Sequence, residues 1–146
     1  MRGRGCPMCA EGRPDISHDG ARVFSSADVD AYLRRAAIAA GYTIVVWRGR
    51  HVAEPTEPSA DEATRYWLDV LGVARAVERC YRPAKLNLLT LGNAVPHLHT
   101  HVVPRYVDDP DPGRPLRHWD RESPPLIPDA EYRDRVAAMK LAFREP

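Results

Sequence analysis

The sequence predicts an α+β fold built around an antiparallel sheet. Residues 42–47 are mostly β-branched or aromatic and follow a glycine, as in a buried strand. Predicted strands and helices alternate along the chain, but the strand links at 48–58 and 92–96 are too short to hold helical crossovers. Because parallel neighbours require such crossovers, we expect antiparallel pairing. The 146 residues suffice for about one domain.

The N-terminal part is expected to hold two strands and one helix. A short strand is predicted over 21–25. Residues 28–40 carry a helical pattern that begins near Asp28 and has Gly41 as its C-cap. The strand over 42–47 then follows directly.

A long central helix is predicted after this strand. Ser59 offers an N-cap, and Glu62, three positions later, completes a capping-box signature. Apolar residues recur every three or four positions from there to about Cys80. Pro83 ends the helix because proline cannot continue it.

Two further strands and a C-terminal helix complete the predicted elements. The strands are expected over 85–91 and 97–103, and prolines flank the second one. The helix is expected over 128–143, with acidic residues in its first turn.

Charge and composition exclude several classes of protein. Lys plus Arg is 21 and Asp plus Glu is 20, so no basic surface for a nucleic acid is implied. No run approaches the roughly 18 apolar residues that span a bilayer, and the first nine residues lack an apolar signal core. We therefore expect a soluble, cytoplasmic protein with no nucleic-acid or membrane partner. Three cysteines are too few for a disulfide scaffold.

Three histidines alternate with other residues in the segment His97-Leu98-His99-Thr100-His101. On a strand, alternate side chains share a face, so the three imidazoles would point the same way. Core packing alone does not explain three polar rings together, because burying polar groups is unfavourable unless they are hydrogen-bonded. Two chemistries suit such a row. One is metal binding by neutral imidazole, and the other is nucleophilic catalysis in which a neighbour fixes the tautomer of the attacking ring.

The residues around this strand offer phosphate ligands. Gly92 permits a tight turn, and the side-chain amides of Asn87 and Asn93 can donate to phosphate oxygens without adding charge. Arg105, just past the strand, is either a phosphate contact or a solvated charge, and we favour the solvated charge.

Cys6 and Cys9 form a C-x-x-C knuckle near the N-terminus. It precedes every predicted strand, which disfavours a thioredoxin-like redox role. A structural zinc site would need two more nitrogen or sulfur donors. The histidine candidates for those places are His18, His51, His97 and His118. The third cysteine, Cys80, falls at a helix end and is expected to pack.

The segment from Leu86 to Arg105 resembles the signature of the histidine triad (HIT) superfamily, His-x-His-x-His followed by two apolar residues. Residues 42–52 are similar to the family's strand that ends in a basic turn and a histidine. The C-x-x-C is similar to that of zinc-carrying members. The resemblance implies a HIT-like catalytic domain over 1–105 with an N-terminal zinc knuckle. Residues 106–146 would form a proline-rich tail and a C-terminal helix packed on the same domain.

The resemblance also implies a homodimer that transfers or hydrolyses nucleotidyl groups through a covalent nucleotidyl-histidine. His99 would attack the α-phosphorus of a phosphoanhydride, phosphoester or phosphoramidate. His101 would hold or polarise the phosphate, and His97 would sit beside them. The substrate would be a small nucleotide, either a mononucleotide conjugate or a dinucleoside polyphosphate. A structural Zn²⁺ would be held by Cys6, Cys9, His51 and His97.

Two positions depart from the family pattern. Ala94 stands where many relatives carry serine or threonine, and Thr100 stands where a larger apolar residue is usual. Two other interpretations stay open. One is a nucleotide-binding module with little turnover, and the other is a metal-dependent enzyme whose histidine row ligates a reactive metal.

Overall fold

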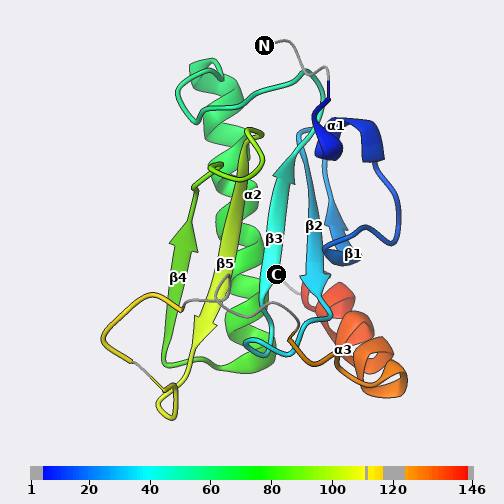
Figure 1. Cartoon of the computed structure of the whole chain (residues 1–146), viewed down its shortest axis with the longest axis vertical. Coiled ribbons are helices and arrows are strands. Elements are labelled where there is room, and N and C mark those ends of the chain that lie inside the picture. The colour runs from blue at the N-terminus through cyan, green and yellow to red at the C-terminus, as the bar shows by residue number, and fades with distance from the viewer. Residues whose placement is uncertain (1–4, 111, 117–123, 145–146) are drawn as a thin grey trace.

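The computed structural model describes residues 5–110, 112–116 and 124–144. Five strands form one sheet in the order β1-β2-β3-β5-β4, and every neighbouring pair is antiparallel (Figure 1). This confirms the predicted α+β fold with its antiparallel sheet, long central helix and C-terminal helix. The elements are α1 (Pro7–Glu11), β1 (Gly20–Ser25), β2 (Val29–Arg34), β3 (Thr43–Trp47), α2 (Ala60–Tyr81), β4 (Lys85–Leu89), β5 (His99–Arg105) and α3 (Asp129–Ala142).

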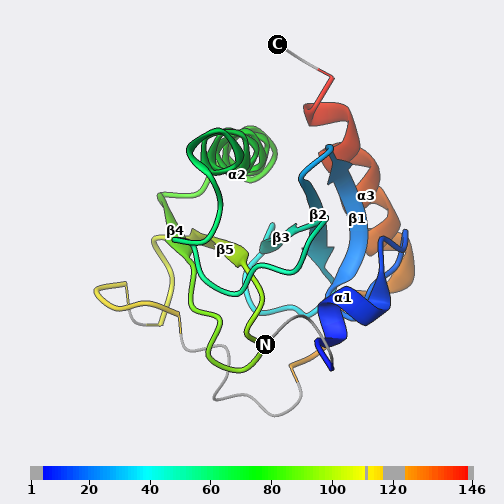
Figure 2. The same cartoon turned by 90° about the horizontal axis from the view of Figure 1, so that it is seen from above.

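The helices cover the sheet unequally. α2 crosses one face and contacts β2, β3 and β5, while α1 lies on the opposite side (Figure 2). α3 packs against β1 and α2. The main core lies between α2 and the sheet, where the side chains of Val45, Trp47, Val70, Val73 and Val77 are almost fully buried. The other face of the sheet is left for the candidate site.

The central helix begins as the capping box predicts. The Ser59 Oγ accepts a hydrogen bond from the backbone N–H of Glu62, and the Glu62 carboxylate accepts one from the backbone N–H of Ser59. The helix continues to Tyr81, and its C-cap Arg82 takes a left-handed conformation. The bounds of β1, β3 and α3 also agree with the predicted elements to within one or two residues.

The helix predicted over 28–40 is wrong, because residues 29–34 form strand β2. β2 lies between β1 and β3 and hydrogen-bonds to both. Val29 through Leu33 are buried, including Asp30, whose carboxylate accepts hydrogen bonds from Arg13 and Arg48. Two ladders and these ion pairs outweigh the helix propensity of the segment, which is only a weak preference. Neither the two ladders nor the ion pairs can be predicted from the local sequence.

Gly41 is not a helix C-cap but part of the turn between β2 and β3. Its φ is 83°, a conformation that favours glycine. A Cβ at this position would lie 2.5 Å from the ring of Tyr81, so glycine also permits a close approach to the end of α2.

The last two strands are shifted relative to their predicted bounds. β4 ends at Leu89 instead of residue 91, and β5 begins at His99 instead of His97. His97 therefore lies before the strand, and its side chain does not belong to the alternation that places His99 and His101 on one face.

The tail after β5 returns to the sheet. The backbone N–H of Ala37 donates to the carbonyl of Pro125, and that of Ile127 donates to the carbonyl of Arg35. Residues 111 and 117–123 of the predicted proline-rich tail lie outside the described residues, so the division at residue 105 stays a prediction. Among the described residues, no helix is long and apolar enough to span a bilayer.

Candidate active site and metal-binding cluster

His99 and His101 lie together on the face of β5 that α2 leaves uncovered. Across the sheet, His101 pairs with Ile44 and His99 pairs with Val46, so these four side chains share a face. The two imidazole centroids are 4.9 Å apart and the ring planes make an angle of 71°. His99 is buried and His101 is half-buried. Both line a cavity of about 970 Å³.

A hydrogen bond fixes the tautomer of His99. Its Nδ1 lies 2.6 Å from the backbone carbonyl oxygen of His97. A carbonyl can only accept, so Nδ1 carries the proton and Nε2 keeps its lone pair in the neutral ring. An unprotonated imidazole nitrogen is the form required of a nucleophile.

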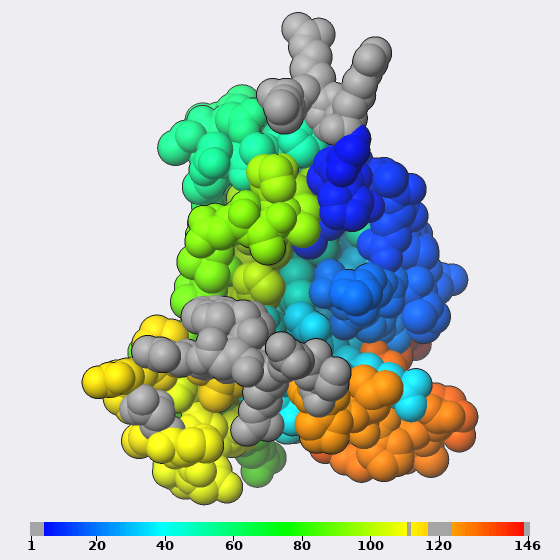
Figure 3. Space-filling view, in the orientation of Figure 1, coloured from blue at the N-terminus to red at the C-terminus, as the bar shows by residue number. Residues whose placement is uncertain are grey.

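The cavity lies between the loop before β5 and the N-terminal segment that contains α1. Figure 3 shows the hollow between the yellow-green loop and the dark blue segment. Gly92, Asn93 and Ala94 line it on the loop side, and Gly92 has a φ of 71°, which lets the chain turn there. On the other side it is lined by residues from α1, from the segment between α1 and β1 and from the strands, including Met8, Ala10, Glu11, His18, Asp19, Arg34 and Ile44.

His101 has a partner on its side away from His99. The hydroxyl of Tyr42 is 2.7 Å from His101 Nδ1. Burial raises the pKa of Tyr42 to about 12, against the smaller opposing effect of Arg34, so the phenol stays protonated at neutral pH. A phenol that donates to Nδ1 leaves the hydrogen of a neutral His101 on Nε2, where it can donate to a phosphoryl oxygen.

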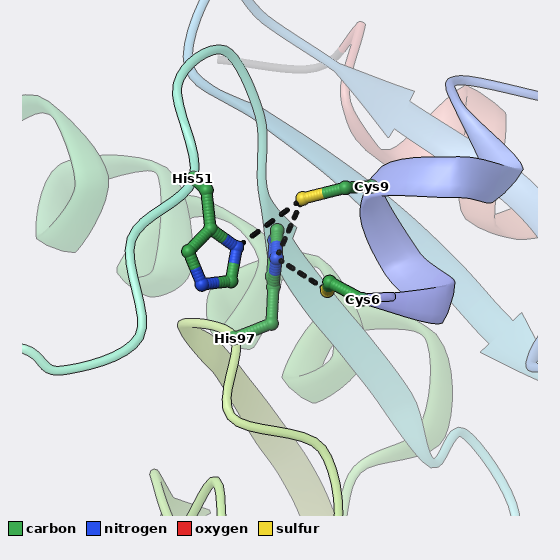
Figure 4. Close-up of side chains that lie close together, drawn as sticks. All are labelled: Cys6, Cys9, His51 and His97. Carbon is green, nitrogen blue, oxygen red and sulfur yellow. Dashed lines mark hydrogen bonds between the residues drawn. The ribbon is translucent and has the colours of Figure 1, made fainter. Parts of the chain in front are cut away.

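Cys6, Cys9, His51 and His97 form a compact cluster of potential metal ligands (Figure 4). One ligand atom from each lies within 4.8 Å of all the others. His97 Nδ1 is 3.5 Å from both cysteine Sγ atoms, and His51 Nδ1 is 3.3 Å from the Cys9 Sγ. Donors on a tetrahedral Zn²⁺ with thiolate and imidazole ligands stand about 3.3–3.8 Å apart, so these distances fit the ion.

The protonation of His97 also fits a metal ligand. Its Nε2 lies 2.8 Å from the backbone carbonyl of Trp47, which fixes the hydrogen on Nε2 and leaves the Nδ1 lone pair facing the cysteines. Burial lowers the pKa of His97, which favours the neutral ring. His97 thus joins the two sites, because its side chain faces the cysteines and its backbone carbonyl accepts from His99.

The other predicted metal-ligand candidates lie elsewhere. His18 lines the large cavity, and His118 lies outside the described residues. Cys80 packs against the core near α3, and its Sγ is 3.7 Å from the carbonyl oxygen of Ala138. His51 and His97 are therefore the candidates that the described structure brings to the C-x-x-C.

Buried ion pairs hold the N-terminal segment on the sheet. Arg48 donates to the Asp30 carboxylate at 2.9 Å, to the Tyr32 hydroxyl at 3.0 Å and to the backbone carbonyl of Met8 in α1 at 3.0 Å. Arg13 donates to both oxygens of Asp30. Burial raises the pKa of Asp30, but these hydrogen bonds outweigh it, and the net pKa lies below its usual value.

The structure separates the two asparagines that we predicted as phosphate ligands. Asn93 lines the cavity of His99. Asn87 instead lies on β4, and its Oδ1 accepts a hydrogen bond from Arg105 at 3.0 Å in a different hollow. The favoured interpretation of Arg105 as a solvated charge is wrong, since Arg105 is buried and pairs with Asp109 at 2.5 Å.

The two departures from the family pattern have different surroundings. Ala94 lines the cavity of His99, so the missing hydroxyl concerns the site itself. Thr100 points to the opposite face, where its Oγ1 lies 2.7 Å from the hydroxyls of both Tyr66 and Thr90. A hydroxyl is therefore accommodated in the core because it has two partners.

Sequence reasoning missed Tyr42 and Arg34 as residues of the site. The sequence pattern indicates only a strand at Tyr42 and a helix at Arg34. Their alternation with Ile44 and Tyr32 was the available signal, but it identifies a face only once the order and register of the strands are known.

Comparison with known proteins points to one family. The model of the HIT domain family matches residues 17–108. A curated Bacillus subtilis protein, "Protein hit", is 31% identical over 106 residues, which are 69% of this chain and 71% of that protein.

Two solved structures illustrate the shared fold. A histidine triad protein from Sinorhizobium meliloti superposes with a TM-score of 0.78 at 20% identity, covering 92% of this chain and 98% of that one. A zinc-bound histidine triad family protein from Mycobacterium smegmatis gives a TM-score of 0.66 at 20% identity, covering 97% and 95%.

Proposed function

Because the chain belongs to the HIT domain family, we propose that it is a nucleotidyl hydrolase or transferase with His99 as its nucleophile. The observation that carries the proposal is the 2.6 Å hydrogen bond from His99 Nδ1 to the carbonyl of His97. It leaves Nε2 unprotonated beside a cavity of about 970 Å³, large enough for a nucleotide.

The reaction has two displacements at the α-phosphorus. In the first, the Nε2 lone pair of His99 forms a bond to phosphorus, and the bond from phosphorus to the leaving group breaks. The leaving group takes that electron pair and is protonated by water. In the second, water or another acceptor attacks phosphorus and loses a proton to solvent, and the P–N bond breaks to free His99. His101, with its ring centroid 4.9 Å from that of His99, holds a phosphoryl oxygen through Nε2–H.

The loop before β5 supplies the remaining phosphate contacts in this proposal. Asn93 donates its side-chain amide, and the chain at Gly92 approaches without a side chain. Ala94 offers no hydroxyl to a departing group. We therefore expect leaving groups that depart without a donor at this position, such as a nucleoside phosphate from an anhydride.

We also propose that Cys6, Cys9, His51 and His97 hold a structural Zn²⁺. The support comes from the donor distances, the tautomer of His97 and the zinc bound by the similar Mycobacterium smegmatis protein. A closed site of four protein ligands stabilises the fold. Here it ties α1, one wall of the cavity, to His97, whose carbonyl orients His99.

The proposed homodimer would form through the edge of the sheet at β4 and the adjacent surface of α2. β4 pairs only with β5 among the described strands, which leaves its other edge available. Large apolar side chains are exposed on these elements and on the loop after β4, namely Trp67, Leu68, Leu71, Leu88 and Leu91. A second copy of the chain at this surface would pair the open strand edge and bury the apolar patch.

Substitution of His99 by alanine tests the reaction. Turnover of diadenosine tetraphosphate and of an adenosine 5′-phosphoramidate should fall by at least about 1,000-fold, since a removed nucleophile typically costs that much or more. The thermal midpoint and metal content of the variant are the controls for a preserved fold. Undiminished turnover of both substrates would contradict the assignment, whereas tight nucleotide binding without turnover in the wild type would favour a binding module.

A further inference from the structure

Arg34 brings a cation into the cavity of His99 that the proposed reaction does not use. It is the last residue of β2, and its side chain lines the cavity with His99 and His101. It also lines a neighbouring hollow, together with His18 and Asp19. The guanidinium therefore stands where the two hollows meet.

The guanidinium of Arg34 is incompletely paired. Its Nε is buried and has no hydrogen-bond partner among the described residues. Among the described residues it forms an ion pair with Asp19, whose carboxylate is 3.8 Å from Nη1, too far for a hydrogen bond. Its Cζ lies 5.3 Å from the centroid of the Tyr42 ring, and the guanidinium also interacts with the Tyr42 hydroxyl, so Tyr42 holds the group in place. A buried unsatisfied donor in a cavity wall is costly unless a ligand completes it.

The sheet sets the separation between Arg34 and the phosphate site. β2 is two strands from β5, with β3 between them, so the two strands are about 10 Å apart, and Arg34 lies two residues along β2 from Tyr32, the residue in register with His101. The Arg34 guanidinium therefore approaches a bound ligand from β2, whereas the imidazoles of His99 and His101 approach it from β5.

We propose that Arg34 is a specificity-determining residue that binds a second anionic group of the substrate. This inference rests on the proposed function and names the substrate class, a nucleotide that carries a phosphate or carboxylate besides the group attacked by His99. A planar guanidinium whose Nε has no partner among the described residues suits such a group, because charge-assisted hydrogen bonds are the strong ones. The anion could belong to the sugar, as a 3′-phosphate, or to the leaving group, as a carboxylate.

The other charges of the cavity modulate this binding. Glu11 accepts a hydrogen bond from the backbone N–H of His18 at 2.8 Å, so its carboxylate already has a partner. Asp19 faces Arg34 and repels an incoming anion. Asp19→Asn should therefore tighten the binding of an anionic ligand, while Arg34→Gln should weaken it.

The first arm of the test measures binding alone. Calorimetry compares adenosine 5′-monophosphate with adenosine 3′,5′-bisphosphate on the wild type, Arg34→Gln, Arg34→Lys and Arg75→Gln. Arg75 lies exposed on α2, on the other face of the sheet, and is a charge-matched control.

The second arm compares kcat/KM for two adenosine 5′-phosphoramidates, one of a neutral amine and one of an amino acid with a free carboxylate. We expect the wild type to prefer the probe with the second anionic group by about 10- to 100-fold in at least one arm, the range of a charge-assisted hydrogen bond. The arm that shows the preference identifies the source of the anion.

Arg34→Gln should abolish the preference with little effect on the probe that lacks the second anionic group. Arg34→Lys should keep part of the preference, and Arg75→Gln should keep it all. A wild type without preference in either arm would overturn the proposal. An Arg34→Gln variant in which the binding or kcat/KM of both probes falls equally would also overturn it. If Arg34→Gln does not fold, an Arg34→Lys variant as selective as the wild type would overturn it instead. If the wild type turns over neither phosphoramidate but still binds the bisphosphate more tightly, the proposed reaction is contradicted. The role of Arg34 as the anion ligand is then still supported.

Discussion

Substitution of Asp30 by asparagine should destabilise the protein strongly, although the two side chains have the same shape. Asp30 is fully buried, and its carboxylate accepts hydrogen bonds from Arg13, Ser25 and Arg48. Asparagine would leave Arg48, whose side chain is only 5% exposed, as a buried cation without its counter-ion. Removing one member of a buried ion pair typically costs about 3–5 kcal/mol.

That cost is a large share of the stability of the domain. Natural domains unfold with about 5–15 kcal/mol, and a protein of this length loses about 2–4 °C of Tm per kcal/mol, so we expect Tm to fall by about 6–20 °C. Urea unfolding, followed by tryptophan fluorescence to which the buried Trp47 contributes, measures the free energy of unfolding directly. Asp134→Asn on the exposed face of α3 is the matched control and should change stability by less than about 0.5 kcal/mol.

The pH dependence gives a second check of the same interaction. The pKa of Asp30 is lowered in the folded protein, so its charge contributes stability above the unfolded pKa, which is about 3.9. This contribution is lost as the pH falls through the folded pKa. The difference between wild type and Asp30→Asn should thus be constant from neutral pH to about 4 and shrink below it. A cost under about 1 kcal/mol at pH 7 would refute the argument that Asp30 anchors β2.

Three further predictions concern the site and the assembly. Tyr42→Phe should lower kcat/KM by about 10-fold with little change in metal content, because it removes the hydroxyl 2.7 Å from His101 Nδ1; unchanged steady-state kinetics would exclude a positioning role. One equivalent of zinc should be found by elemental analysis and be lost in Cys9→Ser with a lower Tm, and a metal-free wild type of equal Tm would contradict the proposed structural ion. Leu68→Glu should convert a dimer into a monomer in light scattering, while Leu141→Glu, an exposed leucine on α3, should not; a monomeric wild type would contradict the proposed interface.

The sequence allowed the fold to be predicted where local patterns and packing agree. The capping box at Ser59 and the β-branched run over 43–47 specify their elements locally, and both appear as expected. β2 could not be predicted in the same way. Its strand conformation depends on two neighbouring strands and on cations from Arg13 and Arg48, which are distant in the sequence.

In the candidate site, too, some residues are predictable from local patterns and others depend on distant parts of the chain. The alternation of His99 and His101 placed both rings on one face, because strand geometry alone requires it. His97 broke this pattern, since β5 begins two residues later and its ring faces the cysteines instead. Arg34 reaches the cavity only through the order of the strands, which no spacing along the chain reveals.

The most direct test of the account is to trap the covalent intermediate. Wild-type protein mixed with diadenosine tetraphosphate, quenched in alkali within one turnover and digested, should yield one peptide that carries an adenylyl group on His99 by mass spectrometry. His99→Ala should yield none. An adduct on any other residue, or rapid turnover with no adduct at any quench time, would contradict nucleophilic attack by His99.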